Sequence, residues 1–295
     1  MHALARSERA AARVRELGAE PAMGDLGDRD AMRAGAEGCE FAFHAAAKVE
    51  DWGDPADFER LNVRGTQNVI DACREAGVRR LVHVGTEAAL MAGQPLVSVD
   101  EDAPLRPDSR ALYSSSKAKA EQLVRDANGN GLETVVIRPR FVWGRGDTTL
   151  LPALVEMVRA GRFRWVSGGG HLTATTHIDN TVEGLWLGAT KAPPGSVYFV
   201  TDGEPVVFRE FVSRLLETQG VTPPTGSVPP ALAGVSAAVA ERLWRLLRRS
   251  GPPPLTRFAV WVSSQECTID IGRAERELGY RPVKSRQQGL AELAR

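Results

Sequence analysis

Short apolar segments alternate with amphipathic stretches along the first two-thirds of the chain. The strand-like segments are residues 2–6, 20–26, 39–47, 78–86 and 132–144, and the last of them runs into a loop. Stretches with helical periodicity lie between or after them, at residues 8–17, 57–77, 109–131 and 150–162. Ser7 stands before the first helical stretch as an N-cap, and Gly18 ends it. Apolar strands that alternate with helices predict a doubly wound α/β fold with a parallel sheet covered on both faces.

The last third of the chain is less regular. Its proline-rich segments, TPPTGSVPP at residues 222–230 and SGPPPLTRF at residues 250–258, are typical of an appended, loop-rich part. A chain of 295 residues with 43% hydrophobic residues can form one large α/β domain with a smaller appendage. We therefore expect a main sheet domain followed by a smaller C-terminal part.

Composition excludes several classes of protein. The 37 basic and 37 acidic side chains cancel, which argues against a nucleic-acid-binding surface. Cys39, Cys73 and Cys267 have neither a metal-ligand spacing nor a disulfide framework, which indicates a reducing compartment. No apolar run approaches the ~20 residues of a membrane span, and no signal peptide is recognisable. These features predict a cytoplasmic protein.

Polar residues that follow the predicted strands mark a candidate site, because a doubly wound sheet binds its ligand at the carboxyl ends of its strands. Asp25, Thr86 and the segment HAAA at residues 44–47 stand in such positions. The helical stretch after Thr86 carries Tyr113 and Lys117 in the motif YSSSK.

Tyr113 and Lys117 are four residues apart, so a helix places both side chains on one face. A phenol has an ordinary pKa of ~10. A neighbouring ammonium, helped by a cationic nicotinamide, favours the phenolate and brings this pKa towards the working range. The hydroxyl of Thr86 can hold a substrate oxygen beside the phenol. Together the three side chains can move a proton to or from an alcohol while hydride moves at its carbon; the alternative is an ordinary Tyr–Lys pair on a surface helix.

Several motifs occur in a specific order along the chain. They are HAAAKVEDWG, NVRGTQNVIDAC, YSSSK, IRPRFVWGRGD, THIDNTVEG and RELGYRP. In this order they resemble the extended short-chain dehydrogenase/reductase superfamily, also called NAD-dependent epimerase/dehydratases. The segments VYFVTDGEPVVFREF and PPPLTRF are similar to its 3β-hydroxysteroid dehydrogenase-like branch. The resemblance covers nearly the whole chain, from residue 2 to about residue 290.

The resemblance implies an NAD(P)-binding Rossmann-type domain at residues 1–150, to which residues 177–201 return, and a mainly substrate-binding part at residues 151–295. It implies that Tyr113 is the catalytic acid/base, that Lys117 is its partner, and that Thr86 stands where the family has Ser or Thr. Gly85 departs from the usual Ser-Ser pair.

The resemblance also implies a set of cofactor contacts. Besides Tyr113 and Lys117, the matched residues are Arg6, Asp25, Leu26, Ala45, Ala46, Asn62 and Pro139. Asp25 and Leu26 match the pair that meets the adenine, and Pro139 matches the loop beside the nicotinamide. Two alternatives stay open: Asp25 can cap a turn, and Asn62 can be a buried polar hub.

Arg6 ends the first predicted strand. An acidic residue at this place holds the ribose hydroxyls of NAD, whereas an arginine suits the extra phosphate of NADP. We therefore expect a preference for NADP, with NAD and a solvated Arg6 as the alternative.

The five histidines have no metal-ligand spacing, and no GxSxG nucleophile motif occurs. His44 and His83 lie inside apolar strand patterns, and His177 opens the segment HIDN. We interpret the histidines as structural and expect no metal site.

In the family, a strand, a GxxGxxG turn and a helix come before the segment that matches HALARS. The triplet GGG at residues 168–170 follows RFRWVS and does not replace that turn. We therefore expect a Rossmann-type sheet without its first βα unit, whose neighbouring strands keep unpaired inner edges. We expect roughly 25 to 35 in-frame codons for this unit upstream of the Met1 codon. Without it, the chain is expected to be poorly soluble and to bind NADP weakly.

Residues 231–250 combine an apolar helical pattern with a basic end. The apolar positions are Leu232, Val235, Val239, Leu243 and Leu246, and the basic ones are Arg242, Arg245, Arg248 and Arg249. We favour a lid or surface helix that packs over the substrate pocket. The alternative is an amphipathic helix that makes weak contact with a membrane surface.

These observations favour an NAD(P)-dependent oxidoreductase that interconverts a secondary alcohol and a ketone on a small, apolar, sterol- or lipid-like molecule. This substrate class rests on the resemblance. The alternatives are a nucleotide-sugar epimerase or dehydratase and a non-catalytic nucleotide-binding regulator. A homodimer is a further expectation, and nucleic acid is not expected as a partner.

Overall fold

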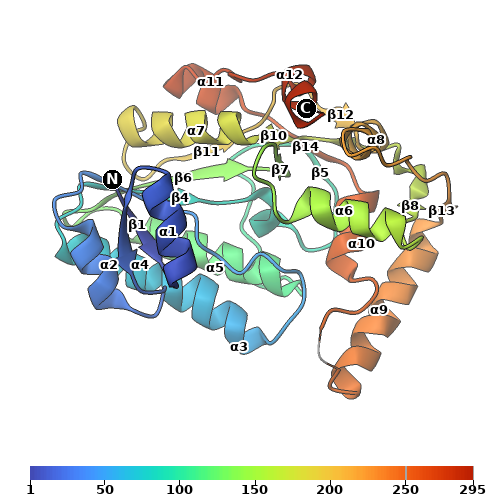
Figure 1. Ribbon diagram of the computed structural model, residues 1–295, viewed down its shortest axis with the longest axis horizontal. Coiled ribbons are helices and arrows are strands. Elements are labelled where there is room, and N and C mark those ends of the chain that lie inside the picture. The colour runs from blue at the N-terminus through green and yellow to red at the C-terminus, as the bar shows by residue number, and fades with distance from the viewer. Residues whose placement is uncertain (250, 295) are drawn as a thin grey trace.

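The main sheet of the protein has four parallel strands in the order β11-β6-β4-β3 in the computed structural model, which describes residues 1–249 and 251–294 (Figure 1). Its strands are β3 (Phe41–His44), β4 (Arg80–Val84), β6 (Glu133–Pro139) and β11 (Val197–Val200). In register, Val82 of β4 lies opposite Phe43 of β3 and Val135 of β6. The α/β fold with a parallel sheet predicted from the sequence is confirmed.

Helices cover both faces of this sheet. Consecutive side chains of a strand point to opposite faces, and in these strands most of the side chains on both faces are apolar. Val135 and Ile137 of β6 pack with Leu187 of helix α7 (Ile178–Thr190). Val136, between them, packs instead with Ile70 and Val124 on the opposite face, from α4 (Gly65–Glu75) and α5 (Leu112–Asp126). In Figure 1, α7 lies above the sheet and α4 and α5 lie below it.

The first two strands form a separate piece. Strands β1 (His2–Ala5) and β2 (Glu20–Met23) pair in parallel, and within residues 1–249 and 251–294 neither pairs with the main sheet. A cavity of about 500 Å³ lies between β1 and β3 and is lined mostly by apolar side chains from these strands and neighbouring helices. The facing edges of β1 and β3 do not pair with each other, as the sequence predicted for the strands on either side of the missing unit.

Local signals in the sequence fix several helix ends. Ser7 caps α1 (Glu8–Glu16) by accepting a hydrogen bond from the Ala10 amide at 3.3 Å. Gly77 follows α4 with φ = 71°, in the left-handed region that glycine adopts without strain. The helical stretch at residues 57–77 is continuous but mixed, with α3 (Pro55–Phe58) and a π-helical turn (Glu59–Arg64) before α4.

The prediction that the strand in residues 132–144 runs into a loop is confirmed, because the strand ends with β6 at Pro139. Phe141 has φ = 48°, and the chain resumes as β7 (Val142–Trp143), which pairs with β10 (Thr176–His177). The ring of Phe141 packs edge-to-face on Phe208 and Phe211. This tertiary packing, which local pattern does not reveal, holds the bend.

A second sheet and several helices form the remainder. The other strands are β5 (Leu96–Val99), β8 (Trp165–Val166), β9 (Leu172–Thr173), β12 (Val206–Val207), β13 (Ser227–Val228) and β14 (Cys267–Ile269). The other helices are α2 (Arg29–Ala36), α6 (Leu150–Arg159), α8 (Phe208–Glu217), α9 (Pro230–Leu246), α10 (Arg257–Ser264), α11 (Gly272–Leu278) and α12 (Arg286–Leu293). Strand β5 pairs with β14 in the second sheet, whose order is β12-β9-β14-β5. Among the described residues, no helix is both long and apolar enough to span a membrane.

Candidate active site

Thr86, Tyr113 and Lys117 meet at the carboxyl end of β4. Thr86 follows the strand and caps a 3-10 turn (Glu87–Leu90) by accepting a hydrogen bond from the Ala88 amide at 3.2 Å. Tyr113 and Lys117 lie one turn apart near the start of α5, which packs against that turn. The phenol of Tyr113 lies close enough to the Thr86 side chain for that side chain to affect its pKa. The structure thus brings together the three residues that the sequence singled out.

The Tyr113 ring lies in apolar surroundings, and Phe258 of α10 packs edge-to-face on it with ring centroids 5.7 Å apart. Burial raises the pKa of Tyr113 well above its ordinary value, and the Glu87 carboxylate raises it further; the Thr86 side chain lowers it in part. This direction is opposite to the one predicted from the sequence. In this structure, burial and a carboxylate outweigh the effect expected of the nearby ammonium.

Lys117 is almost fully buried, and its Nζ donates a hydrogen bond of 2.8 Å to the Val84 carbonyl oxygen. This bond ties α5 to the last residue of β4. Burial lowers the pKa of Lys117 to about 8, and the Glu121 carboxylate one turn further along α5 partly opposes this change. The ammonium is therefore a labile acid close to neutral pH.

Glu87 belongs to the same cluster, and the sequence analysis missed it. Its carboxylate accepts hydrogen bonds from Thr86 Oγ1 at 2.8 Å and from Arg140 Nη1 at 2.5 Å. Arg140 is also buried and donates two hydrogen bonds, of 3.1 and 3.2 Å, to Thr173 Oγ1. The only signal in the sequence was the occurrence of both charges inside apolar runs, where a charge needs a buried partner.

Gly85 has no room for the serine that the family usually places there. A Cβ atom on Gly85 would lie 2.8 Å from Val136 Cγ1 and 3.0 Å from Arg138 Cγ. The departure from the Ser-Ser pair therefore matches the packing of this sheet and leaves the Thr86 hydroxyl in place.

The residues matched to cofactor contacts fall into two groups. Leu26, Ala45 and Ala46 line the cavity between β1 and β3. Arg6 is exposed directly after β1, and Asp25 is exposed after β2. The Asp25 carboxylate accepts a hydrogen bond of 2.7 Å from the Gly27 amide, so it also caps the turn, as the alternative interpretation held.

Asn62 is a buried polar hub, and Pro139 ends β6 beside β4. The Asn62 side chain accepts from the Lys48 amide at 2.7 Å and donates to the Lys48 carbonyl at 3.0 Å and to Ser116 Oγ at 2.9 Å. These bonds fix the loop after β3 against α5. Pro139 is buried at the carboxyl end of β6, next to the carboxyl end of β4, which Thr86 follows.

Two histidines lie in the main sheet without a charged partner. Burial lowers the pKa of His44 to about 3, and its Nε2 lies 2.9 Å from Thr66 Oγ1. Burial also lowers the pKa of His83 well below its ordinary value. Both rings are therefore neutral at physiological pH, which supports a structural role.

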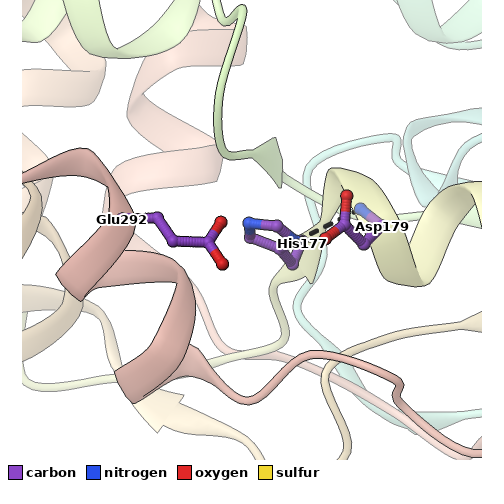
Figure 2. Close-up of side chains that lie close together, drawn as sticks. All are labelled: His177, Asp179 and Glu292. Atoms are coloured by element: carbon purple, nitrogen blue, oxygen red, sulfur yellow. Dashed lines mark hydrogen bonds and ion pairs between the residues drawn. The ribbon is translucent and has the colours of Figure 1, made fainter.

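His177, Asp179 and Glu292 lie close enough together to resemble a metal site, as Figure 2 shows. The ammonium of Lys284, however, lies 3.3 Å from Asp179 Oδ2 and 2.5 Å from Glu292 Oε1. It already supplies the positive charge that the two carboxylates need. The cluster joins α7 to α12, and the expectation that no metal binds stays a prediction.

Comparison with known proteins gives the family. A sequence model of the 3-beta hydroxysteroid dehydrogenase/isomerase family matches residues 4–229. A 4-hydroxy-2-methyl-3-oxo-4-farnesyl-3,4-dihydroquinoline-1-oxide ketoreductase of Stigmatella aurantiaca is 47% identical over 99% of this chain and 88% of its own length. A 2-alkyl-3-oxoalkanoate reductase of Stenotrophomonas maltophilia is 38% identical over 94% of this chain and 86% of its own length.

The fold agrees with solved structures. A dTDP-glucose 4,6-dehydratase from Streptomyces venezuelae, solved with NAD bound, has a TM-score of 0.76 at 22% identity and covers 99% of this chain and 85% of its own. At this identity the likeness shows the Rossmann-type fold alone. Together with the family match and the two relatives, it leads to one conclusion: the chain belongs to the 3β-hydroxysteroid dehydrogenase/isomerase family and is an NAD(P)-dependent oxidoreductase.

Proposed function

We propose that the protein interconverts a ketone and a secondary alcohol on an apolar, lipid-like molecule, with Tyr113 as the proton donor and acceptor. The observation that carries this proposal is the meeting of Thr86, Tyr113 and Lys117 at the end of β4. The two relatives named above are a ketoreductase of a farnesylated quinoline oxide and a reductase of alkyl-oxoalkanoates, which supports this substrate class.

The residues present fit the two ends of a nicotinamide dinucleotide. Tyr113, Lys117 and Pro139 would meet the nicotinamide end, which supplies or accepts hydride when the cofactor is bound. Leu26 and Ala45, in the cavity beside β3, would meet the other end. Among residues 1–249 and 251–294, no glycine-rich turn lies at the β1 edge of this cavity to hold the pyrophosphate.

The chain's own residues supply the proton and orient the oxygen of the substrate. The Thr86 hydroxyl donates its proton to Glu87, so its oxygen is left as an acceptor beside the phenol. In the alcohol-forming direction, Tyr113 gives its proton to the substrate oxygen; in the reverse direction, the phenolate takes it back. Lys117 places a positive charge behind the phenol, on the same helix face.

The apolar walls around Tyr113 favour a lipid-like substrate over a sugar nucleotide. Leu90, Met91 and Trp261 pack in the same apolar cluster as Tyr113 and Phe258. A diphosphate or a sugar would leave polar groups unpaired against such walls. The nucleotide-sugar alternative is supported only by fold neighbours, and the intact Thr86, Tyr113 and Lys117 argue against a non-catalytic regulator.

The decisive experiment replaces Tyr113 by Phe in the purified protein and assays a 2-alkyl-3-oxoalkanoate ester with NADPH. Loss of the hydroxyl should reduce kcat by ~100- to 10,000-fold, the usual value of general acid–base catalysis, while far-UV circular dichroism stays unchanged. An unchanged rate would contradict the role of Tyr113. Turnover of a sugar nucleotide without net consumption of cofactor would contradict the substrate class.

Within this function we propose a preference for NADP over NAD. This preference rests on Arg6, which is exposed directly after β1. An acidic side chain at this place would bind the ribose hydroxyls of NAD, whereas an arginine can bind the extra phosphate of NADP. Arg6→Ala should raise KM for NADPH by about 5- to 100-fold, the loss of one or two charge-assisted hydrogen bonds, and leave KM for NADH nearly unchanged. Arg15→Ala, also an exposed arginine, is the matched control. An equal effect on both cofactors would contradict the preference.

A further inference from the structure

Helix α9 presents an apolar stripe to solvent. Leu232, Val235, Val239, Leu243 and Leu246 recur at spacings of three and four residues and are between 45% and 76% exposed. In Figure 1, α9 projects from the lower right of the molecule, away from the main sheet. The predicted surface helix is therefore present with its apolar side chains in solvent, and its role as a lid over the substrate pocket stays a prediction.

The opposite face of α9 holds the helix in place. Ala233 and Ala237 pack with Val166 and with Val260 of α10. Glu241, also on this face, accepts hydrogen bonds of 2.7 Å from the backbone amide and the Nε of Arg257. The helix is thus anchored through small residues and one ion pair, and its largest apolar side chains are left outside.

A group of cations flanks the apolar stripe at one end. Arg242, Arg245, Arg248 and Arg249 are all exposed. The guanidinium groups of Arg245 and Arg249 lie over the rings of Trp52 and Trp244, at 5.1 and 5.3 Å from the ring centroids. In residues 230–249 the one acidic side chain is Glu241, and Arg257 already engages it. The net charge of this end of the helix is therefore strongly positive.

We propose that α9 binds the surface of an anionic lipid bilayer, with its apolar stripe among the acyl chains and its arginines at the headgroups. An amphipathic helix with arginines beside an apolar face has the features of such interfacial binding. Each arginine near an anionic surface contributes attraction, and the acyl boundary removes the stripe from water. Ser250, the last residue of the segment singled out in the sequence, lies outside the described residues.

The position of α9 suits the delivery of a substrate from the bilayer. Helix α10 follows α9 in the chain, packs against it, and carries the Phe258 ring that contacts Tyr113. An apolar molecule that leaves the bilayer at α9 would therefore arrive one helix away from the catalytic phenol. This consequence rests on the proposed function, whereas the binding of α9 to lipid does not.

A second copy of the chain fits this surface less well. Pairing two α9 helices would cover the stripes but would supply no acidic partner for the arginines, because Glu241 is buried and engaged. Anionic lipid satisfies both the stripe and the cations. The charges therefore favour a bilayer over a homodimer at this surface.

The test is co-sedimentation of the whole protein with vesicles of phosphatidylglycerol and phosphatidylcholine in equal parts, at low salt, after subtraction of protein that sediments without vesicles. We expect binding that weakens with salt and is lost with phosphatidylcholine alone. Val239→Asp combined with Leu243→Asp should abolish binding. Val182→Asp, an equally exposed apolar position on α7, should not change it.

Single arginine variants test the contribution of the positive charges to vesicle binding. Arg248→Gln and Arg249→Gln should each weaken binding about 5-fold, the value of one cation at an anionic surface, and Arg15→Gln should leave it unchanged. Tyr113→Phe protein should bind as the wild type does, which separates lipid binding from catalysis. Failure to bind anionic vesicles would overturn the proposal, and so would a lipid-free dimer in sedimentation velocity that the double aspartate variant dissociates.

Discussion

Glu87 is the second cause, after burial, that raises the pKa of Tyr113. Its carboxylate accepts the Thr86 hydroxyl proton and is one of the causes that raise the pKa of Tyr113. A negative charge close to a phenol disfavours the phenolate, so under the proposed function Glu87 favours the protonated form of Tyr113, which is the acid. This arrangement suits the reduction of a ketone more than the oxidation of an alcohol.

The first prediction concerns the charge of this residue. Glu87→Gln keeps the shape of the side chain but removes one cause of the raised pKa, so the pKa of Tyr113 should fall. The pH at which alcohol oxidation reaches half its maximum should fall with it, because that direction needs the phenolate. Rate–pH profiles of kcat/KM measure this shift. Glu87→Asp restores the charge and should return the midpoint towards that of the wild type; a midpoint that does not move in Glu87→Gln would contradict the role of Glu87.

Lys117 gives a prediction for stability. Its pKa is lowered to about 8 in the folded protein, whereas an unfolded chain holds a lysine near its ordinary value. Between these two pKa values the unfolded state binds more protons than the folded state. Lys117 therefore makes the free energy of unfolding rise as pH rises above about 8. Lys117→Met should remove this contribution, which amounts to about 3 kcal/mol over the full range between the two pKa values.

Urea unfolding of both proteins at several pH values above neutrality measures the difference. The free energy of unfolding of the wild type should gain on that of Lys117→Met as pH rises. Parallel pH dependences in the two proteins would show that the buried ammonium does not titrate in this window.

At the scale of elements, Asp202 joins the end of β11 to three other segments. Its Oδ1 accepts hydrogen bonds from the His177 amide at 2.5 Å and from Asn180 Nδ2 at 2.7 Å. Its Oδ2 accepts from Trp143 Nε1 at 2.8 Å and from Thr175 Oγ1 at 2.7 Å. One side chain thus satisfies donors from β7, β10 and α7.

Asp202→Ala should lower the free energy of unfolding by at least about 3 kcal/mol, because it leaves several buried donors without an acceptor. Asp54→Ala, which removes the exposed cap of α3, should cost only about 1 kcal/mol. Denaturant unfolding compares the two variants. Equal losses would mean that the Asp202 bonds contribute no more than a single helix cap.

The elements differ in how well the sequence predicts them. Strand β4 and the position of Thr86 follow from an apolar run that ends in a hydroxyl, and the pairing of Tyr113 with Lys117 follows from helical spacing. The loop after β6 also follows from the sequence, but the left-handed backbone of Phe141 does not, because aromatic contacts with α8 hold it. Glu87 was missed because its partner Arg140 lies 53 residues further along the chain.

Helix α9 shows a different limit. Its apolar period predicts an amphipathic helix, and the helix is there. The period does not say which face is buried, and here the face with Ala233, Ala237 and Glu241 is the buried one. The buried face is the one with small side chains, because they let α9 approach α10 closely.

At the scale of the whole molecule, the sheet is in two pieces with a cavity of about 500 Å³ between them. The residues matched to the cofactor lie on both sides of this cavity. Under the proposed function, nucleotide affinity would depend on how firmly β1 and β3 are held relative to each other. The catalytic end of the site, built on β4, β6 and α5, does not depend on this spacing.

The facing edges of β1 and β3 also define what can occupy the space between them. Among the described residues, no strand pairs with the backbone donors and acceptors of these two edges. One extended segment placed between the edges would bond to both at once, and a parallel orientation would continue the pairing pattern of the neighbouring strands. An extended peptide in this space would therefore join the two pieces into one sheet.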